Sequence, residues 1–218
     1  MEVSQLLSMI WAGTGETLLM VLASTAIGYI VGMPLGVLLT VSDNDGIKPM
    51  PAVYRVLDLI INITRSIPFL ILLILIQPFT KLVVGKSYGT VATVVPLTVA
   101  AAPLIARMVE SSLKEVDHGV VEAAISLGAS KMTIITKVLI GESRTSLLVG
   151  STISLGTILG YSAMAGVVGG GGLGDIAIRY GYYRYETGIM IATVVVLVLL
   201  MQILQWIGMF ISKRIDKR

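Results

Sequence analysis

The stretch 117-DHGVVEAAISLGASKMTIITKVLIGE-142 lies in the middle of the chain, between two long apolar blocks. Apolar residues recur along it at helical spacing, but polar and charged residues interrupt them throughout. A segment of this length and polarity inside so apolar a chain must face water or a partner protein rather than lipid. Its charged side chains include Asp117, Glu122, Lys131 and Lys137, and it also carries His118, the only histidine of the protein.

The composition of the chain sets its class. Hydrophobic residues make up 55% of the 218 residues and charged residues only 13%, and the mean hydropathy is +0.90. A soluble domain has about 25% charged residues, so this chain is predicted to be an all-α membrane protein. The absence of cysteine excludes disulfides, iron–sulfur clusters and thiolate metal sites, and one histidine leaves little for zinc or haem. We therefore expect no metal and no cofactor.

Five apolar runs on either side of the central stretch are long enough to cross a bilayer, which takes about 20 helical residues. A short segment with Trp11, residues 1–14, is expected to lie at the membrane interface or to fray. Residues 15–212 then form one membrane domain, and residues 213–218 form a basic tail. The five spans are predicted at about residues 16–41, 53–76, 91–109, 147–168 and 188–211.

Small residues and breaks mark particular spans. Gly28, Gly32 and Gly36 leave one face of the first span without side chains, so another helix can approach closely. Five glycines in residues 169–174 predict an extended, tightly packed connection after the fourth span.

The second span contains Asp58 and Arg65 on one face, and then the interruption Arg65-Ser66-Ile67-Pro68. A charge within a span costs about 2.5–3.5 kcal/mol on insertion scales, so it should face a cavity or a partner. Two interpretations remain open at this point. Arg65 either lines a polar path and meets a carboxylate, or caps backbone carbonyls that Pro68 leaves free.

The distribution of positive charge predicts the orientation. Five spans place the termini on opposite sides, and basic residues concentrate on the cytoplasmic side of a membrane. With the N-terminus outside, the C-terminus and the 107–146 segment lie inside, and the net charge of +3 reflects this loop bias rather than nucleic-acid binding. The inner side then holds Lys48, Arg55, Arg107, Lys114, Lys131, Lys137, Arg144, Lys213, Arg214, Lys217 and Arg218, and the outer side Lys81, Lys86, Arg179 and Arg184.

Three motifs match nucleotide or hydrolase signatures only by letters. Gly85-Lys86-Ser87 lacks the first glycine of a phosphate loop and faces outside. Residues 85–89 also match a hydrolase elbow, but His118 lies across the membrane. The glycines of 169–174 follow a membrane span rather than a strand of a βαβ unit. Any energy from ATP must therefore come from another chain, and this chain is not expected to be an enzyme.

The central stretch itself is predicted to fold as two short helices. Gly119 opens the first helix, Gly128 allows a sharp exit, and Ser130 caps the second helix. The two apolar faces are expected at Val120, Ala124 and Leu127, and at Met132, Ile135 and Leu139. The product is a compact knob in the cytoplasm; an amphipathic loop lying on the bilayer is the alternative.

The same stretch resembles a known signature. Glu122-Ala123-Ala124, followed three residues later by Gly128, is similar to the EAA-x3-G motif of ABC importer permeases. In that family the segment forms coupling helices that dock in a cleft of the ATPase subunit. The family's usual ending, I-x-L-P, is replaced here by Val138-Leu139-Ile140-Gly141, so the exit from the second helix is expected to be looser. The resemblance assigns ATPase coupling to Glu122, Ala123, Ala124, Gly128 and Ser130.

Further segments narrow the resemblance to methionine importer permeases, and it covers nearly the whole chain. They are Asn62–Phe69, Gly160–Gly166, Gly171–Asp175 and Tyr180–Tyr182. The resemblance implies a type I ABC importer permease fold in the bacterial inner membrane. It also implies a homodimer with two ABC ATPase subunits and an extracytoplasmic substrate-binding protein, expected to be a lipoprotein. The implied activity is uptake of L- and D-methionine or close analogues by alternating access, with no catalytic residue on this chain.

The expected translocation path is formed by Arg65, Ser66, Tyr161, Ser162 and Met164. Met164 is predicted to close the path with a flexible thioether, or else to be an ordinary core residue. Tyr161 and Ser162 either line the path or pack between helices. The rival function is an ion-coupled secondary amino-acid carrier, which would need acids in the membrane and no ATPase; Asp58 is its only candidate.

Overall fold

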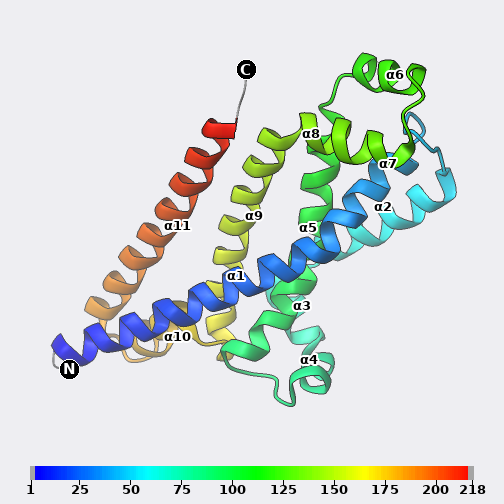
Figure 1. The fold of residues 1–218 in the computed structure, drawn as a ribbon. Coiled ribbons are helices and arrows are strands. Elements are labelled where there is room, and N and C mark those ends of the chain that lie inside the picture. Colours follow the sequence, from blue (N-terminus) through cyan, green and yellow to red (C-terminus); the bar gives the residue numbers. More distant parts are fainter. Residues whose placement is uncertain (1–2, 216–218) are drawn as a thin grey trace.

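The computed structural model describes residues 3–215, and every regular element within that range is a helix. The helices form one membrane domain around a shared apolar core (Figure 1). The four longest are α1 Val3–Ser42, α5 Thr90–Lys114, α9 Arg144–Ala165 and α11 Thr187–Ile215. The shorter elements are α2 Pro51–Ser66, α3 Phe69–Leu75, α4 Gln77–Val84, α6 His118–Ser126, α7 Lys131–Thr133, η1 Ile134–Leu139, α8 Ile140–Glu142, η2 Gly166–Val168, α10 Gly172–Ile176 and η3 Ala177–Tyr182.

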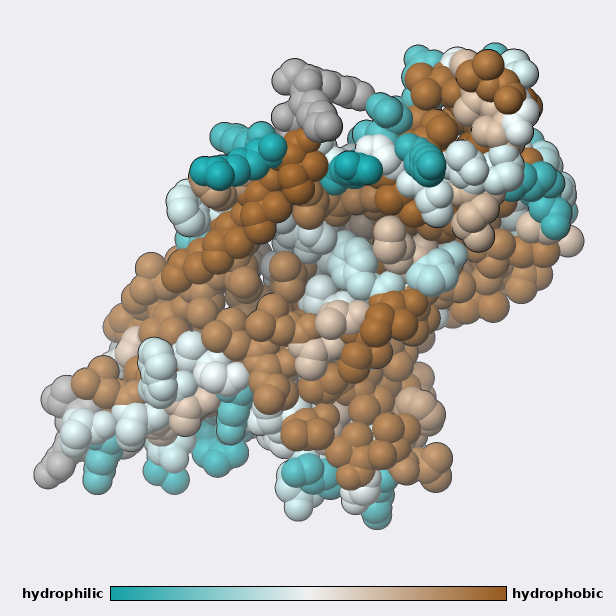
Figure 2. Space-filling model, viewed as in Figure 1, coloured by the Kyte–Doolittle hydropathy of each residue, from teal (hydrophilic) through white to brown (hydrophobic). Residues whose placement is uncertain are grey.

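The surface is that of a membrane protein. Four helices are long and apolar enough to cross a bilayer, and the pair α2 and α3 provides a fifth, bent candidate. On the face drawn in Figure 2, brown apolar residues cover the middle, and teal residues gather along the upper and lower edges. The first helix begins at one of these edges, whereas the described end of α11 lies at the other, on the same side as α6 (Figure 1). The predicted all-α membrane class is confirmed.

The second predicted span is not one straight helix. It consists of α2 and α3, which meet at an angle of 101°. Ile67 between them is extended, with φ −79° and ψ 122°, because the ring of Pro68 disfavours helical geometry in the preceding residue. The bend therefore lies at the Arg65–Pro68 interruption that the sequence singled out.

The ends of the chain also differ from the expected segments. Residues 3–14 continue into α1 without a break, so the expected interfacial segment is not a separate element. At 40 residues α1 is about 60 Å long, about twice the hydrocarbon thickness, and it runs obliquely across the other helices (Figure 1). Lys213 and Arg214 of the basic tail belong to α11, whereas residues 1–2 and 216–218 lie outside the described residues.

The closest helix packing joins α1 to α5, and it depends on the three glycines of the first span. A Cβ atom at Gly32 would lie 2.6 Å from the carbonyl oxygen of Ala102, and one at Gly36 would lie 2.5 Å from that of Ala106. The backbones themselves are thus in contact, as the glycine spacing predicts.

The glycine-rich segment after α9 is tightly packed, but it is not extended. It forms η2, α10 and η3, which fold back against α1 and α9. Gly172, with φ +74°, donates its N–H to Glu16 Oε2 at 2.6 Å, and Leu173 donates to Thr17 Oγ1 at 2.9 Å. Polar side chains of α1 therefore satisfy the backbone at the start of α10, and the glycines permit the tight turns that this needs.

A direct test of the α1–α5 contact replaces Gly32 with alanine. We expect Gly32→Ala to lower the free energy of unfolding by about 1–3 kcal/mol, because the added methyl group meets backbone that cannot move away. The matched control is Gly15→Ala on the same helix, where an added Cβ meets no atom within 4 Å. Thermal unfolding in detergent measures both, and equal midpoints for the two variants would contradict the proposed contact.

Candidate functional site

The central stretch folds as two short helices at one end of the membrane domain (Figure 1). The first, α6, begins at His118, one residue before the expected start. Asp117 caps it, since its Oδ1 accepts the N–H of Gly119 at 2.6 Å. The cap fixes where the chain turns away from α5.

Gly128 ends α6 in the left-handed conformation, with φ +74°. The N–H of Gly128 bonds to the carbonyl of Ile125 at 2.9 Å, and that of Ala129 bonds to the carbonyl of Ala124 at 3.0 Å. This pair of bonds is a Schellman motif, which favours glycine at the left-handed position. The sharp exit predicted at Gly128 is confirmed.

The second helix starts where the sequence predicts and then changes type. Ser130 Oγ accepts the N–H of Thr133 at 3.2 Å, which confirms the predicted cap. The following turn, η1, is a π-helix, so side chains five positions apart share a face. The buried residues are accordingly Ile134 and Leu139; of the expected apolar stripe Met132, Ile135 and Leu139, Met132 is 68% exposed and Ile135 is partly exposed.

The two helices expose an apolar surface rather than bury one. Val121, Ala124 and Ala129 pack against the main core. Of the apolar face expected on α6, Ala124 packs against the core, whereas Val120 and Leu127 are exposed, Leu127 to 87%. Figure 2 shows brown surface over α6. We call this the docking surface; it comprises Val120, Glu122, Ala123, Ile125, Leu127 and Met132, all of them exposed.

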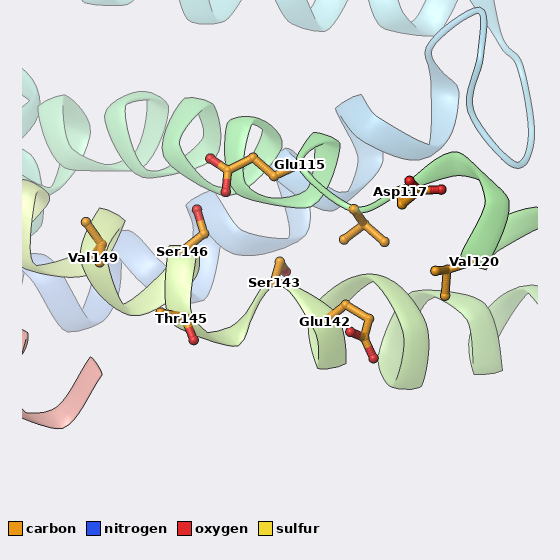
Figure 3. A pocket seen from close by; sticks show the side chains of 9 residues that line it. Glu115, Asp117, Val120, Glu142, Ser143, Thr145, Ser146 and Val149 are labelled. Carbon is orange, nitrogen blue, oxygen red and sulfur yellow. The ribbon is translucent and has the colours of Figure 1, made fainter. Parts of the chain in front are cut away.

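Two pockets flank the base of the knob. One, of about 380 Å³, separates the end of α5 and the start of α6 from α8 and α9 (Figure 3). The other, of about 340 Å³, lies between residues 43–47 and Leu139. The first includes the acids Glu115, Asp117 and Glu142, yet within residues 3–215 no group of His, Asp and Glu side chains could hold a metal ion. The knob thus joins the membrane domain through a narrow base.

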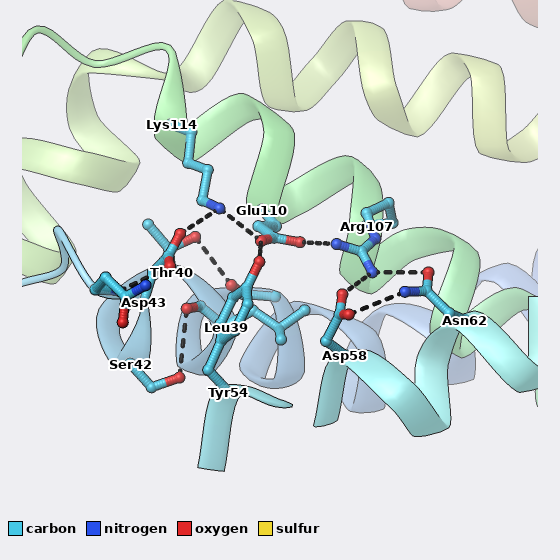
Figure 4. Close-up of polar contacts among 12 residues, drawn as sticks. Leu39, Thr40, Ser42, Asp43, Tyr54, Asp58, Asn62, Arg107, Glu110 and Lys114 are labelled. Atoms are coloured by element: carbon cyan, nitrogen blue, oxygen red, sulfur yellow. Dashed lines mark hydrogen bonds and ion pairs between the residues drawn. The ribbon is translucent and has the colours of Figure 1, made fainter. Parts of the chain in front are cut away.

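A charge network that the sequence did not reveal ties three helices together nearby (Figure 4). Arg107 on α5 forms ion pairs of 2.6 Å with Asp58 on α2 and with Glu110. Lys114 pairs with Glu110 at 2.8 Å and with Asp43, just after α1, at 2.6 Å. Further hydrogen bonds come from the hydroxyl of Tyr54 to Glu110 at 3.2 Å and from Asn62 to Asp58 at 3.0 Å.

One signal for this network was present in the sequence. Arg107, Glu110 and Lys114 follow each other at spacings of three and four, so they lie on one face of a helix. The partner of Asp58 was not predictable, because Arg107 is distant in sequence whereas Arg65 is near. Outside the spans, the hydrogen bond from Lys114 lowers the pKa of Asp43. Asp43 therefore contributes stability above its ordinary pKa, and this contribution is lost as the pH falls through the lowered value.

The five expected path residues do not all lie together. Arg65 and Tyr161 line one cavity of about 110 Å³, in which the ring of Tyr161 stacks on Phe69 with centroids 4.6 Å apart. The side chain of Arg65 forms no hydrogen bond or ion pair with the residues of the 3–215 range, so it neither caps backbone carbonyls nor meets a carboxylate in that part of the chain.

The remaining path residues lie elsewhere. Ser66 is exposed and donates its hydroxyl to the carbonyl of Asn62 at 2.7 Å. Ser162 is buried and bonds to the carbonyl of Leu159 at 2.8 Å, as expected for helix packing. Met164, in the last turn of α9, is 51% exposed and is therefore not a core residue of the isolated chain.

Comparison with known proteins gives a consistent result. Residues 32–217 match the family model described as binding-protein-dependent transport system inner membrane component. The chain is 50% identical over 205 residues to the probable D-methionine transport system permease protein MetI of Vibrio cholerae, covering 94% of this chain and 91% of that protein. It is 48% identical over 154 residues to the D-methionine transport system permease protein MetI of Escherichia coli K12, covering 71% of each.

Solved structures agree with the sequence matches. A chain from the inward-facing conformations of the MetNI methionine ABC transporter superimposes with a TM-score of 0.94 at 43% identity, covering 100% of both chains. A chain of an amino acid ABC transporter superimposes with a TM-score of 0.81 at 20% identity, which shows a shared fold.

The charge network makes a testable contribution to stability. Arg107→Ala leaves the carboxylate of Glu110, whose side chain is only 4% exposed, without one of its two cations. We expect a loss of about 3 kcal/mol in the free energy of unfolding, the low end for breaking a buried pair, since Lys114 remains in place. The control is Arg55→Ala, at an exposed arginine of α2. The free energy of unfolding of both variants is measured in detergent. Equal losses of this free energy in the two variants would refute the role of the network.

Proposed function

Because the chain belongs to the family of binding-protein-dependent transport system inner membrane components, we propose that it forms the membrane path of an ATP-driven importer of methionine. Its fold is that of a type I ABC importer permease. Methionine, in the D form and the L form, is the proposed substrate because the similar permeases are named for D-methionine transport. The chain itself hydrolyses no ATP in this proposal, and a separate ATPase subunit supplies the energy.

The observation that carries the proposal is the docking surface on α6 and the following turn. Its large apolar side chains, Val120, Ile125, Leu127 and Met132, are 45–87% exposed. Exposed apolar groups around an exposed acid suit a protein partner, because burying them on docking is favourable. Small residues at Ala123 and Ala124 let that partner approach closely. We assign ATPase docking to Glu122, Ala123, Ala124, Gly128 and Ser130.

The knob is built to transmit movement as a unit. The cap at Asp117, the turn at Gly128 and the cap at Ser130 fix its two helices relative to each other. Val121 and Ala124 connect it to the core that also holds α1, α5 and α9. When two ATPase subunits close on ATP, the docked knob moves, and the bundle attached to it shifts between inward-open and outward-open states. This is alternating access.

The complete transporter requires more chains. Five spans enclose a regulated path poorly, whereas two copies related by a two-fold axis provide ten. The helix α11 is almost wholly exposed along its apolar length, which suits lipid and a second copy. A substrate-binding protein, expected to be a lipoprotein, would deliver methionine from outside. The bias of the positive charges supports an orientation with the N-terminus outside and α6 in the cytoplasm.

The proposed path combines groups of different kinds. Arg65, Ser66 and Tyr161 lie near the break between α2 and α3, and Ser162 packs beside Tyr161 on α9. Met164, half exposed in the single chain, closes the path when the second copy is present. An ion-coupled carrier is disfavoured, because Asp58, its candidate ion site, is already paired with Arg107.

The docking role is tested at Gly128. Gly128→Asp puts charge on the docking surface, while its added Cβ meets no atom within 4 Å. We expect uptake to fall at least about tenfold, with a stability cost of only about 1–2 kcal/mol for the left-handed conformation. Gly128→Ala carries the same backbone strain without charge, and Gly141→Asp carries the charge at another open glycine of the segment. Uptake by the reconstituted complex is measured, and wild-type uptake with Gly128→Asp would refute docking at this position.

The proposed activity is tested directly in proteoliposomes. The chain, its ATPase and its substrate-binding protein are reconstituted, and uptake of labelled D-methionine and L-methionine is followed with and without ATP. We expect uptake of both forms that depends on ATP and on the ATPase. Equal uptake without the ATPase, driven by an ion gradient, would instead support a secondary carrier.

A further inference from the structure

We propose that the cavity beside the break between α2 and α3 is a subsite that binds the carboxylate and the apolar side chain of an amino-acid substrate. The inference rests on the proposed function and specifies how the path would recognise its substrate. Arg65 would bind the carboxylate at the mouth of the cavity. The stacked rings of Phe69 and Tyr161 would receive the side chain.

Arg65 is a cation without a counter-ion. It lies in the last turn of α2, is exposed, and has no ion pair or hydrogen bond with the residues of the 3–215 range. The acid on the same helix face, Asp58, accepts bonds from Arg107 and Asn62 instead. An unpaired charge within a membrane domain is costly unless it serves a pathway or a ligand. A carboxylate fits the guanidinium in a two-pronged, charge-assisted arrangement.

The neighbouring hydroxyls do not compete for this role. Thr64 donates to the carbonyl of Ile60 at 2.9 Å, and Ser66 donates to that of Asn62 at 2.7 Å. Their donor hydrogens are therefore already engaged along α2. The guanidinium of Arg65 is the charged donor of the cavity lining, and the hydroxyl of Tyr161 adds a neutral one.

The rest of the cavity suits an unbranched apolar side chain. Its walls include Leu72 on α3, Ala100 and Leu104 on α5, and the ring of Tyr161 on α9. The volume of about 110 Å³ is several times the about 10–15 Å³ that a single water needs, so the cavity has room for a side chain of several heavy atoms. A methionine side chain has four heavy atoms, and its thioether makes favourable contacts with aromatic rings. The parallel rings of Phe69 and Tyr161 offer such contacts.

The lining contains no acid that could bind the substrate ammonium. The subsite therefore contacts two of the substituents on the α-carbon and leaves the third without a charged partner. Two points of attachment do not distinguish mirror images, so D- and L-methionine should occupy this subsite about equally. A substrate analogue that lacks the carboxylate, in contrast, should bind to this subsite much more weakly.

The test uses the reconstituted complex and separates binding from turnover. For Arg65→Gln, we expect the apparent KM for D- and L-methionine to rise about tenfold, as for loss of a charge-assisted bond. Arg65→Lys should lie between Arg65→Gln and wild type, since it keeps the charge but loses the two-pronged geometry. The matched control is Arg55→Gln, an exposed arginine of the same helix, which should behave as wild type.

The substrate provides a second arm that needs no variant. Methionine amide, which lacks the carboxylate, should compete with labelled methionine about tenfold less well than methionine does in the unmodified complex, and this difference should vanish in Arg65→Gln. An Arg65→Gln variant with the KM of Arg55→Gln overturns the subsite while leaving the transport function intact. If the Arg65→Gln variant misfolds, the competition experiment in the unmodified complex still tests the subsite. Equal competition by methionine amide and by methionine would overturn it. Absence of ATP-dependent uptake in the unmodified complex contradicts the proposed function, and the subsite with it.

Discussion

The backbone contact between α1 and α5 is the constraint on which the rest of the molecule depends. Gly32 and Gly36 bring α1 so close to Ala102 and Ala106 that no side chain fits between them. In lipid the hydrophobic effect does not hold helices together, so close packing of this kind must do so. Because α1 is tilted and longer than the bilayer is thick, the contact also sets the angle at which the bundle is assembled.

The charge network continues this contact toward the knob. Asp43 follows α1 directly, Asp58 belongs to α2, and Arg107, Glu110 and Lys114 extend from the glycine contact to the end of α5. Only three residues separate Lys114 from the start of α6. The network therefore links the end of α5, next to the knob, to α2 and to the end of α1. The π-turn of η1 lies in the second helix of the knob, shortly before α9, and such turns often occur at functional sites.

Much of this arrangement could be predicted from the sequence, because its signals are local. The apolar runs gave the membrane class, the spacing of Gly28, Gly32 and Gly36 gave the close helix contact, and Gly128 and Ser130 gave the turn and the cap of the knob. What failed depended on distant partners or unusual helix geometry. The partner of Asp58 is 49 residues away, and the π-turn moved the buried face from Met132 to Ile134. Close to Gly141, at the exit from the second helix, the hydroxyl of Ser143 donates to the carbonyl of Leu139 at 2.6 Å.

The contact between α1 and the start of α10 has a consequence for biogenesis. Glu16 and Thr17 accept backbone N–H groups from residues 156 positions later in the chain. The first helix is made early in synthesis, yet these two polar side chains find their partners only after Leu173 has been made. Contacts of such sequence separation form slowly, because a long loop must close first. Glu16 and Thr17 therefore acquire these partners late, and a nascent chain stopped before Gly172 leaves both side chains without them.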